Sequence, residues 1–226
     1  MGKGSMVNAY GLTNDGVRVH AEEIARACES GFQVIPSYYP QFSRGLDQAI
    51  QDALQAFEVY KRVLVRFFLA LEFCFSCPNA ESIRENMANI LALIRAVREK
   101  YPEIVLIGKI SVVHPFSFVQ DLIGAGVRVI HGVNSIPWNI IFPGIPSPLA
   151  KVGGGGVSGD DAFARALDYN TELRQRIPGV PLIMGCGVTL LCDARQYFGV
   201  GANCVSVCTV CRRNPDVAMR IINEYA

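Results

Sequence analysis

The sequence lacks an excess of charge of either sign. Among its 226 residues, 21 are lysine or arginine and 20 are aspartate or glutamate, so the formal net charge is +1. A general nucleic-acid binder needs surplus basic side chains to neutralise phosphates. The balance therefore argues against nucleic acid as a partner and fits a small neutral or weakly anionic substrate.

Long apolar runs are also missing. The most apolar segment, 63–77, contains Arg66 and Glu72 and is shorter than the stretch of about 20 residues that spans a bilayer. The N-terminal residues MGKGSMVNAYG contain no apolar core of a signal peptide. We expect a cytoplasmic protein that does not bind a membrane.

Cysteine is not scarce. The eight cysteines are Cys28, Cys74, Cys77, Cys186, Cys192, Cys204, Cys208 and Cys211. Several lie in apolar runs such as VSVCTV, which is typical of free thiols in a reducing cytosol. The spacing of the last three invites a zinc interpretation, but no fourth ligand lies nearby in the sequence, so we predict no metal site.

Short apolar runs alternate with longer amphipathic ones along the whole chain. The predicted strands are 32–39, 67–76, 104–113, 127–135, 181–188 and 204–210. The predicted helices are 15–30, 44–63, 80–101, 116–125, 160–177, 191–199 and 214–225. Nearly continuous apolar strands separated by helices predict one α/β domain, residues 1–226, built on a parallel sheet.

Two architectures compete for such a pattern: an open doubly wound sheet and a closed (β/α)8 barrel. No GxGxxG motif follows the first predicted strand, so the dinucleotide-binding fold lacks its fingerprint. Polar residues instead mark the ends of several strands, including Lys109, Asn134 and Thr209. This favours the barrel, although only six strands are predicted and a complete barrel has eight.

Several motifs, in this order, resemble those of the dihydroorotate dehydrogenase family. They are NAYGLTNDG (8–16), FSCPN (75–79), GK (108–109), VNS (133–135), GGVSG (155–159), GCG (185–187) and VSVCT (205–209). The flavin domain of dihydropyrimidine dehydrogenases is similar too. The likeness covers nearly the whole chain and implies a TIM barrel that binds flavin mononucleotide (FMN).

The resemblance implies the chemistry of two residues. Cys77, fixed by Pro78, would take a proton from C5 of dihydroorotate while a hydride leaves C6 for flavin N5. A thiol needs only a modest fall in its pKa to act near neutrality. Lys109 would lie by flavin N1 and O2, where negative charge develops on reduction; the alternative is a lysine that points into solvent.

The resemblance also implies the binding residues. The pyrimidine substrate would be held by Asn8, Gly11, Leu12, Asn79, Asn134 and Ser135. The FMN would be held by Lys109, Ser158, Gly159, Gly187, Cys208 and Thr209. Carboxamides suit a pyrimidine because each offers a donor and an acceptor, and glycine amides at a helix N-terminus suit a phosphate. Taken singly, an asparagine is more often a turn residue and a glycine run more often a loop.

Three departures from the family pattern bear on activity. The family carries further residues ahead of NAYGLTNDG, which form the first barrel strands, so this barrel closes differently, is completed by another chain, or has an open flavin pocket. Cys74 stands where the family usually has asparagine, which puts orotate itself in doubt. The sequence has Gly187-Val188 where the family usually has Gly-Gly, and Cys208 where the family frequently has glycine.

Two functions follow as alternatives. The first is an FMN oxidoreductase of pyrimidine biosynthesis. The second is a catalytically silent barrel relative with a weakened flavin site that acts as a structural or partner-binding protein. The resemblance leaves the electron acceptor open among fumarate, NAD and quinone, and it implies a homo-oligomer such as a dimer. Among other residues, we interpret His20 as a surface residue, His131 as a core or pocket-lining residue, and Trp138 as part of a long loop that covers substrate or meets a partner.

Overall fold

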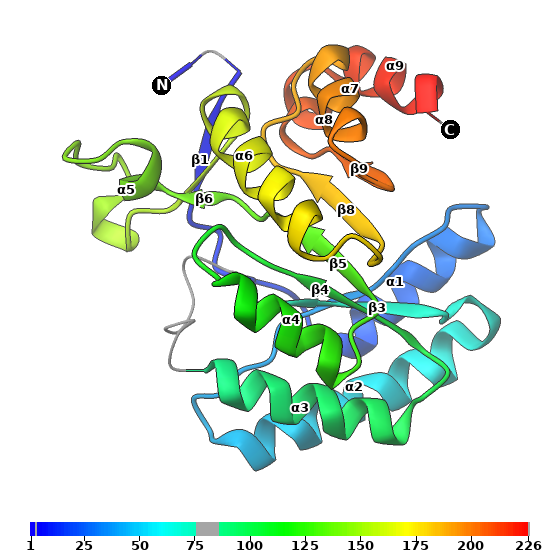
Figure 1. Cartoon of the computed structure of the whole chain (residues 1–226). Helices are drawn as coiled ribbons and strands as arrows, with labels where there is room; N and C mark the ends of the chain where they lie inside the picture. The colour runs from blue at the N-terminus through cyan, green and yellow to red at the C-terminus, as the bar shows by residue number, and fades with distance from the viewer. Residues whose placement is uncertain (3, 76–85, 226) are drawn as a thin grey trace.

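The main element of the fold is a sheet of six parallel strands. The computed structural model describes residues 1–2, 4–75 and 86–225. The strands run in the order β2-β3-β4-β5-β8-β9 (Figure 1). Their bounds are Ser37–Tyr38 (β2), Ala70–Cys74 (β3), Val105–Lys109 (β4), Val129–Gly132 (β5), Leu182–Gly185 (β8) and Cys204–Ser206 (β9). Neighbours in the sheet follow one another in chain order, as in a barrel, whereas a doubly wound sheet reverses its order at a switch point.

The sheet does not close into a ring among the described strands. There, β2 pairs only with β3, and β9 pairs only with β8. The fold is therefore of the (β/α) barrel type that the sequence predicts, with six of the eight strands of a complete barrel and an opening between β9 and β2.

Helices connect successive strands and cover the sheet. They are α1 (Val17–Glu29), α2 (Leu46–Leu64), α3 (Met87–Lys100), α4 (Phe116–Ala125), α5 (Trp138–Ile141), α6 (Asp160–Arg176), α7 (Leu191–Gly199), α8 (Thr209–Arg213) and α9 (Pro215–Tyr225). Short 3-10 helices occupy Val65–Phe67 (η1) and Ala150–Val152 (η2). Helices α2, α3 and α4 pack side by side against the sheet (Figure 1). None of the described helices combines the length and apolar character that crossing a membrane requires.

Strand β3 shows how the core and the barrel interior separate. Side chains alternate between the two faces of a strand. Leu71 and Phe73 are fully buried on the helix side, where the Phe73 ring stacks on Phe57 of α2 at 6.1 Å between centroids. Glu72 and Cys74 therefore point to the opposite face, inside the curved sheet. The apolar core lies between strands and helices, and polar groups are left for the interior.

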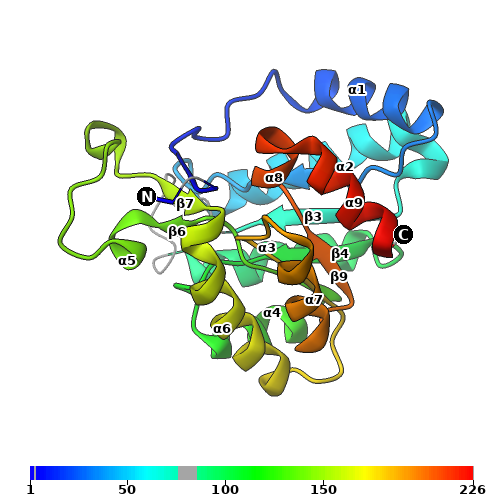
Figure 2. The same ribbon diagram turned by 90° about the horizontal axis from the view of Figure 1, so that it is seen from above.

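A second, antiparallel sheet lies beside the first in Figure 2. Its order is β1-β7-β6, with β1 at Met6–Asn8, β6 at Ile136–Pro137 and β7 at Gly156–Ser158. Within GGVSG, residues 156–158 form a strand rather than a loop, because this segment gains backbone partners on both sides. The predicted long loop around Trp138 likewise contains the short helix α5.

Two predicted strands are longer than the observed ones. The strand predicted at 32–39 is only Ser37–Tyr38, since Pro36 has no N–H to donate. The strand predicted at 204–210 ends at Ser206, because its partner β8 ends at Gly185, and Thr209 already begins α8. The predicted helix 80–101 is observed as α3, Met87–Lys100, and residues 80–85 lie outside the described part of the chain.

Candidate active site

A cavity of about 170 Å³ lies at the carboxyl ends of β4, β5, β8 and β9 and beside the small sheet. Its lining includes these residues from the sequence prediction: Asn8, Lys109, Asn134, Ser135, Ser158, Gly187, Cys208 and Thr209. They come from segments far apart in the sequence. Parallel strands bring their carboxyl ends to one edge, and β1 and β7 carry Asn8 and Ser158 to the same place.

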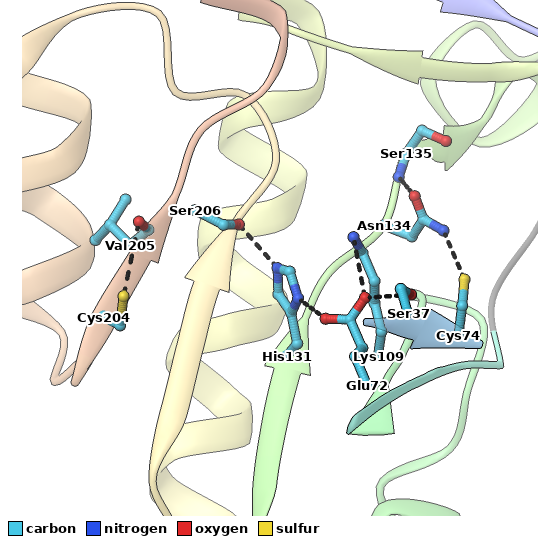
Figure 3. Close-up of polar contacts among 10 residues, drawn as sticks. All are labelled: Ser37, Glu72, Cys74, Lys109, His131, Asn134, Ser135, Cys204, Val205 and Ser206. Carbon is cyan, nitrogen blue, oxygen red and sulfur yellow. Dashed lines mark hydrogen bonds and ion pairs between the residues drawn. The ribbon is translucent and has the colours of Figure 1, made fainter. Parts of the chain in front are cut away.

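Lys109 ends β4 and points into the barrel interior rather than into solvent. Its Nζ atom lies 3.7 Å from Oε1 of Glu72, and its side chain is 26% exposed (Figure 3). Burial alone would raise the pKa of Glu72, but the hydrogen bond from His131, the charge of Lys109 and the hydrogen bond from Ser37 outweigh it and lower that pKa. The carboxylate is therefore ionised near neutral pH and holds the ammonium group at the cavity.

Asn134 follows β5 and is oriented by two neighbours. Its Nδ2 atom lies 3.7 Å from Sγ of Cys74, and its Oδ1 atom accepts the N–H of Ser135 at 2.8 Å (Figure 3). Cys74, the departure from the family pattern, is thus in contact with one of the predicted substrate-binding amides.

Two hydroxyl groups meet at the other end of the cavity. Oγ1 of Thr209 donates to Oγ of Ser158 at 2.8 Å, and both residues line the hollow together with Gly187. Gly187 adopts a φ of 88° and packs against Phe163 of α6, where a Cβ atom would lie 2.4 Å from the Phe163 Cα. A side chain at this position would therefore push α6 away from the cavity.

Gly159 has a different neighbour from the one predicted. It does not line the cavity, and a Cβ atom there would lie 2.2 Å from the carbonyl oxygen of Gly4. The first turn of α6 is held by the N-terminal segment: Oδ2 of Asp161 accepts the N–H of Gly2 at 2.7 Å. The small size of Gly159 thus serves the contact with the N-terminus.

The remaining predicted residues fall into two groups. Cys77 and Asn79 fall outside the described residues. Gly11 is exposed, and Leu12 lines a different cavity, of about 510 Å³, with His20. His20, predicted to be a surface residue, is half-buried, and its Nδ1 atom lies 3.2 Å from the hydroxyl oxygen of Tyr60.

The sequence analysis assigned no role to Glu72 or Ser206. In the structure both contact His131, which is buried and lines the cavity, in agreement with its prediction as a core or pocket-lining residue. The available signal was a charged or polar side chain inside an apolar strand, where an unpartnered group is costly to bury. Sequence alone did not show that these three groups face one another.

The lining suits the two polar ends of an FMN molecule. Hydroxyl donors and glycine amides match a phosphate, and the Lys109 ammonium matches the electron-rich edge of a flavin ring. The hollow of about 170 Å³ is smaller than the typical ligand pocket of about 300 to 1,000 Å³. An FMN bound here would therefore extend beyond it.

Comparison with known proteins relates this chain to dihydroorotate dehydrogenases. The family model described as dihydroorotate dehydrogenase matches residues 1–226. The catalytic subunit of dihydroorotate dehydrogenase B (NAD(+)) from Thermotoga maritima is 26% identical over 96% of this chain and 76% of its own length. Dihydroorotate dehydrogenase (quinone) from Kineococcus radiotolerans is 26% identical over 98% of this chain and 64% of its own length.

A solved structure shares the fold. The crystal structure of DHODH from Eimeria tenella in complex with ferulenol superposes with a TM-score of 0.75 at 18% sequence identity. The match covers 98% of this chain and 66% of the Eimeria chain. The chain thus spans about two thirds of the length of this structural relative.

Proposed function

Because this chain belongs to the dihydroorotate dehydrogenase family, we propose that it oxidises dihydroorotate, or a related cyclic amide, with FMN as the hydride acceptor in pyrimidine biosynthesis. The observation that carries the proposal is the convergence of Lys109, Asn134 and Thr209, from three different segments, on one cavity. An ammonium, a carboxamide and a hydroxyl group are the groups that this chemistry requires.

Each lining group has a defined role in the proposal. Lys109 stabilises the negative charge that FMN acquires when it accepts the hydride. Asn8, Asn134 and Ser135 orient the pyrimidine through donors and acceptors. The phosphate is bound by side chains and backbone amides of Ser158, Gly159, Gly187, Cys208 and Thr209. Gly159 does not line the cavity and has no side chain, so in this proposal it contributes only its backbone N–H.

The proton step is assigned to Cys77. This assignment rests on the resemblance of FSCPN to the family motif, with Asn79, Gly11 and Leu12 as further substrate-binding residues. Because Cys74 replaces an amide, a cyclic amide with fewer hydrogen-bonding groups than orotate is a second substrate of the same class. One relative is named as an NAD(+) enzyme and another as a quinone enzyme, so the electron acceptor has to be identified by a separate experiment. We place the enzyme in the cytoplasm as a homodimer.

A second candidate function is a catalytically silent relative that binds a partner chain. One observation favours it: β2 and β9 each have a single partner among the described strands, and the cavity at the end of β9 is small. Unpaired strand edges are sites where another segment can add a strand. In this case the cavity would bind FMN weakly or not at all.

Flavin binding separates the two candidates. The full chain is titrated with FMN, and binding is read from absorbance and from quenching of flavin fluorescence. We expect saturable binding, and bleaching of the flavin absorbance on anaerobic addition of dihydroorotate. The absence of any binding would contradict the oxidoreductase and favour the silent relative.

Two variants test the roles of the residues. Lys109→Met removes the ammonium beside the flavin ring, so we expect FMN to bind about tenfold more weakly, or about 1.4 kcal/mol. The matched control is Lys151→Met, because Lys151 is exposed on η2. This control variant should bind FMN as tightly as the unmodified chain does. Cys77→Ala should keep the colour and lose the bleaching by substrate. Full turnover in Cys77→Ala would refute its role as the base.

A further inference from the structure

Three side chains on the inner face of the sheet form one hydrogen-bonded line. Oε2 of Glu72, on β3, lies 2.6 Å from Nδ1 of His131, on β5. Nε2 of the same histidine lies 2.8 Å from Oγ of Ser206, on β9 (Figure 3). The order is carboxylate, imidazole, hydroxyl, and each group comes from a different strand.

The protonation of this line follows from the chemistry of its members. Glu72 is ionised, so it can only accept a hydrogen bond, and the proton of the imidazole must be on Nδ1. Burial lowers the pKa of His131, and this effect outweighs the carboxylate, so the ring is neutral at pH near 7. Nε2 is then a lone-pair acceptor, and the Ser206 hydroxyl donates to it.

A glycine makes the contact between β9 and β5 possible. Strand β8 lies between them, and Ser206 pairs with Gly185 in the register of the sheet. A Cβ atom at Gly185 would lie 1.9 Å from Oγ of Ser206. The absence of a side chain there leaves room for the hydroxyl to reach across β8 to the histidine.

The line is largely shielded from bulk water, yet two of its three side chains can be reached from the cavity. The side chains of Glu72 and His131 are 13% and 10% exposed, so water competes little for their hydrogen bonds. His131 and Ser206 nevertheless line the cavity, together with Lys109. A small molecule in that cavity would meet a hydroxyl group with its base in place and a positive charge nearby.

We propose that Ser206, His131 and Glu72 form a nucleophilic triad that transfers the acyl group of a small activated ester to Ser206 and then to water. In the first step, Oγ of Ser206 attacks the ester carbonyl carbon as its proton passes to Nε2 of His131. The bond from carbon to the leaving oxygen breaks, and that oxygen takes the proton from His131. Water then attacks the acyl carbon as its proton passes to Nε2 of His131, the bond from carbon to Oγ of Ser206 breaks, and Oγ takes the proton from His131 as the acid leaves. No oxidant or reductant is needed.

Two groups outside the nucleophile assist. Glu72 is a positioning residue, since it keeps the imidazole in the tautomer that leaves Nε2 free. Lys109 supplies positive charge for the oxyanion that forms at the ester carbonyl. This activity goes beyond the oxidoreductase and requires no flavin, so each stands or falls separately.

Covalent labelling tests the triad directly. The flavin-free full chain is incubated with a small alkyl fluorophosphonate, and the adduct is located by intact mass and peptide mapping. We expect one adduct per chain, on Ser206, and none on Ser206→Ala. Turnover of p-nitrophenyl acetate should follow the same pattern. An adduct on another residue, or no adduct, would overturn the proposal.

Histidine variants separate a triad from mere accessibility. His131→Gln leaves Ser206 in place without its base, and we expect the labelling rate to fall by about 100-fold or more, in the range of general-base contributions. His20→Gln is the matched control, because His20 lies on α1 at the second cavity, and its rate should equal that of the unmodified chain. Circular dichroism confirms that each variant is folded before labelling. Equal labelling rates in folded His131→Gln and in the unmodified chain would contradict the proposed triad.

Discussion

At the scale of single residues, the inner face of the sheet gathers several polar partners around one carboxylate. Glu72 accepts hydrogen bonds from Ser37 and His131 and lies near Lys109. Each of these partners offsets part of the free-energy cost of desolvating the carboxylate, which explains why a charge is tolerated inside an apolar strand. Lys109 and His131 could be singled out in the sequence as polar groups in apolar strands. That Glu72 is their shared partner could not be predicted, because Glu72 and Lys109 lie 37 positions apart in the sequence.

A different histidine predicts how stability depends on pH. His114 is buried, its Nδ1 atom accepts the N–H of Ser111 at 3.0 Å, and burial lowers its pKa from 6.5 to about 4. Between these pH values the unfolded chain binds a proton here and the folded chain does not, so stability falls as pH falls through this window. The loss reaches about 3 kcal/mol at the acid end. His131, whose pKa burial also lowers, acts with the same sign.

Urea unfolding of the unmodified chain and of His114→Gln, followed from neutral pH to about pH 4.5, measures this effect. We expect a shallower fall in the free energy of unfolding for the variant. The readout is the slope of the free energy of unfolding against pH. A loss of stability in His114→Gln that is the same at every pH leaves this slope unchanged. Parallel curves for the two proteins would contradict the assignment to His114.

At the scale of elements, helices whose boundary signals are local were predicted well. Helices α4 and α7 have the bounds predicted from the sequence, 116–125 and 191–199. Gly126 ends α4 in the left-handed conformation with φ 119°, as a C-terminal glycine does. Strands β1, β6 and β7 were not predicted, because two- and three-residue strands carry no periodic signal. The residues paired between β1 and β7, from Asn8↔Gly156 to Met6↔Ser158, are also 148 to 152 positions apart in the sequence.

The start of α7 predicts the effect of a capping mutation. Oδ2 of Asp193 accepts the N–H of Thr189 at 2.9 Å and the N–H of Leu190 at 2.8 Å, and the residue is 8% exposed. Asp193→Ala leaves both donors without this acceptor, so we expect a loss of about 1 to 2 kcal/mol in the free energy of unfolding. Asp168→Ala, on the exposed side of α6, is the control and should change it by less than about 0.5 kcal/mol. Equal effects of the two substitutions in urea unfolding would contradict the capping role.

At the scale of the whole molecule, one core joins both ends of the chain. Its buried residues run from Ala21 on α1 to Ile221 on α9, and the small sheet contributes Ile136 and Val157 to it. Because the small sheet shares this core, it should not unfold separately from the barrel strands. The prediction of one domain over residues 1–226 therefore has a direct test.

Trp138 provides the probe. It is the only tryptophan, lies on α5 beside the small sheet, and donates from Nε1 to the carbonyl of Ile145 at 2.7 Å. Its fluorescence reports on that region, whereas far-ultraviolet circular dichroism reports mainly on the helices around the barrel. We expect both signals to change at the same urea concentration, and we expect Phe73→Ala, in the barrel core, to lower both midpoints together. A fluorescence transition that stays in place while the other moves would show two independent units.

The sequence by itself determined the parallel α/β order, most helix bounds and the residue types of the site, because apolar periodicity and capping residues are local properties of the chain. Only the tertiary structure decided which polar groups meet. Strand register and the missing side chain of Gly185 bring Ser206 to His131, and alternation along β3 turns Glu72 toward both His131 and Lys109. Contacts across strands depend on distances between segments remote in sequence, and those distances exist only once the sheet has formed.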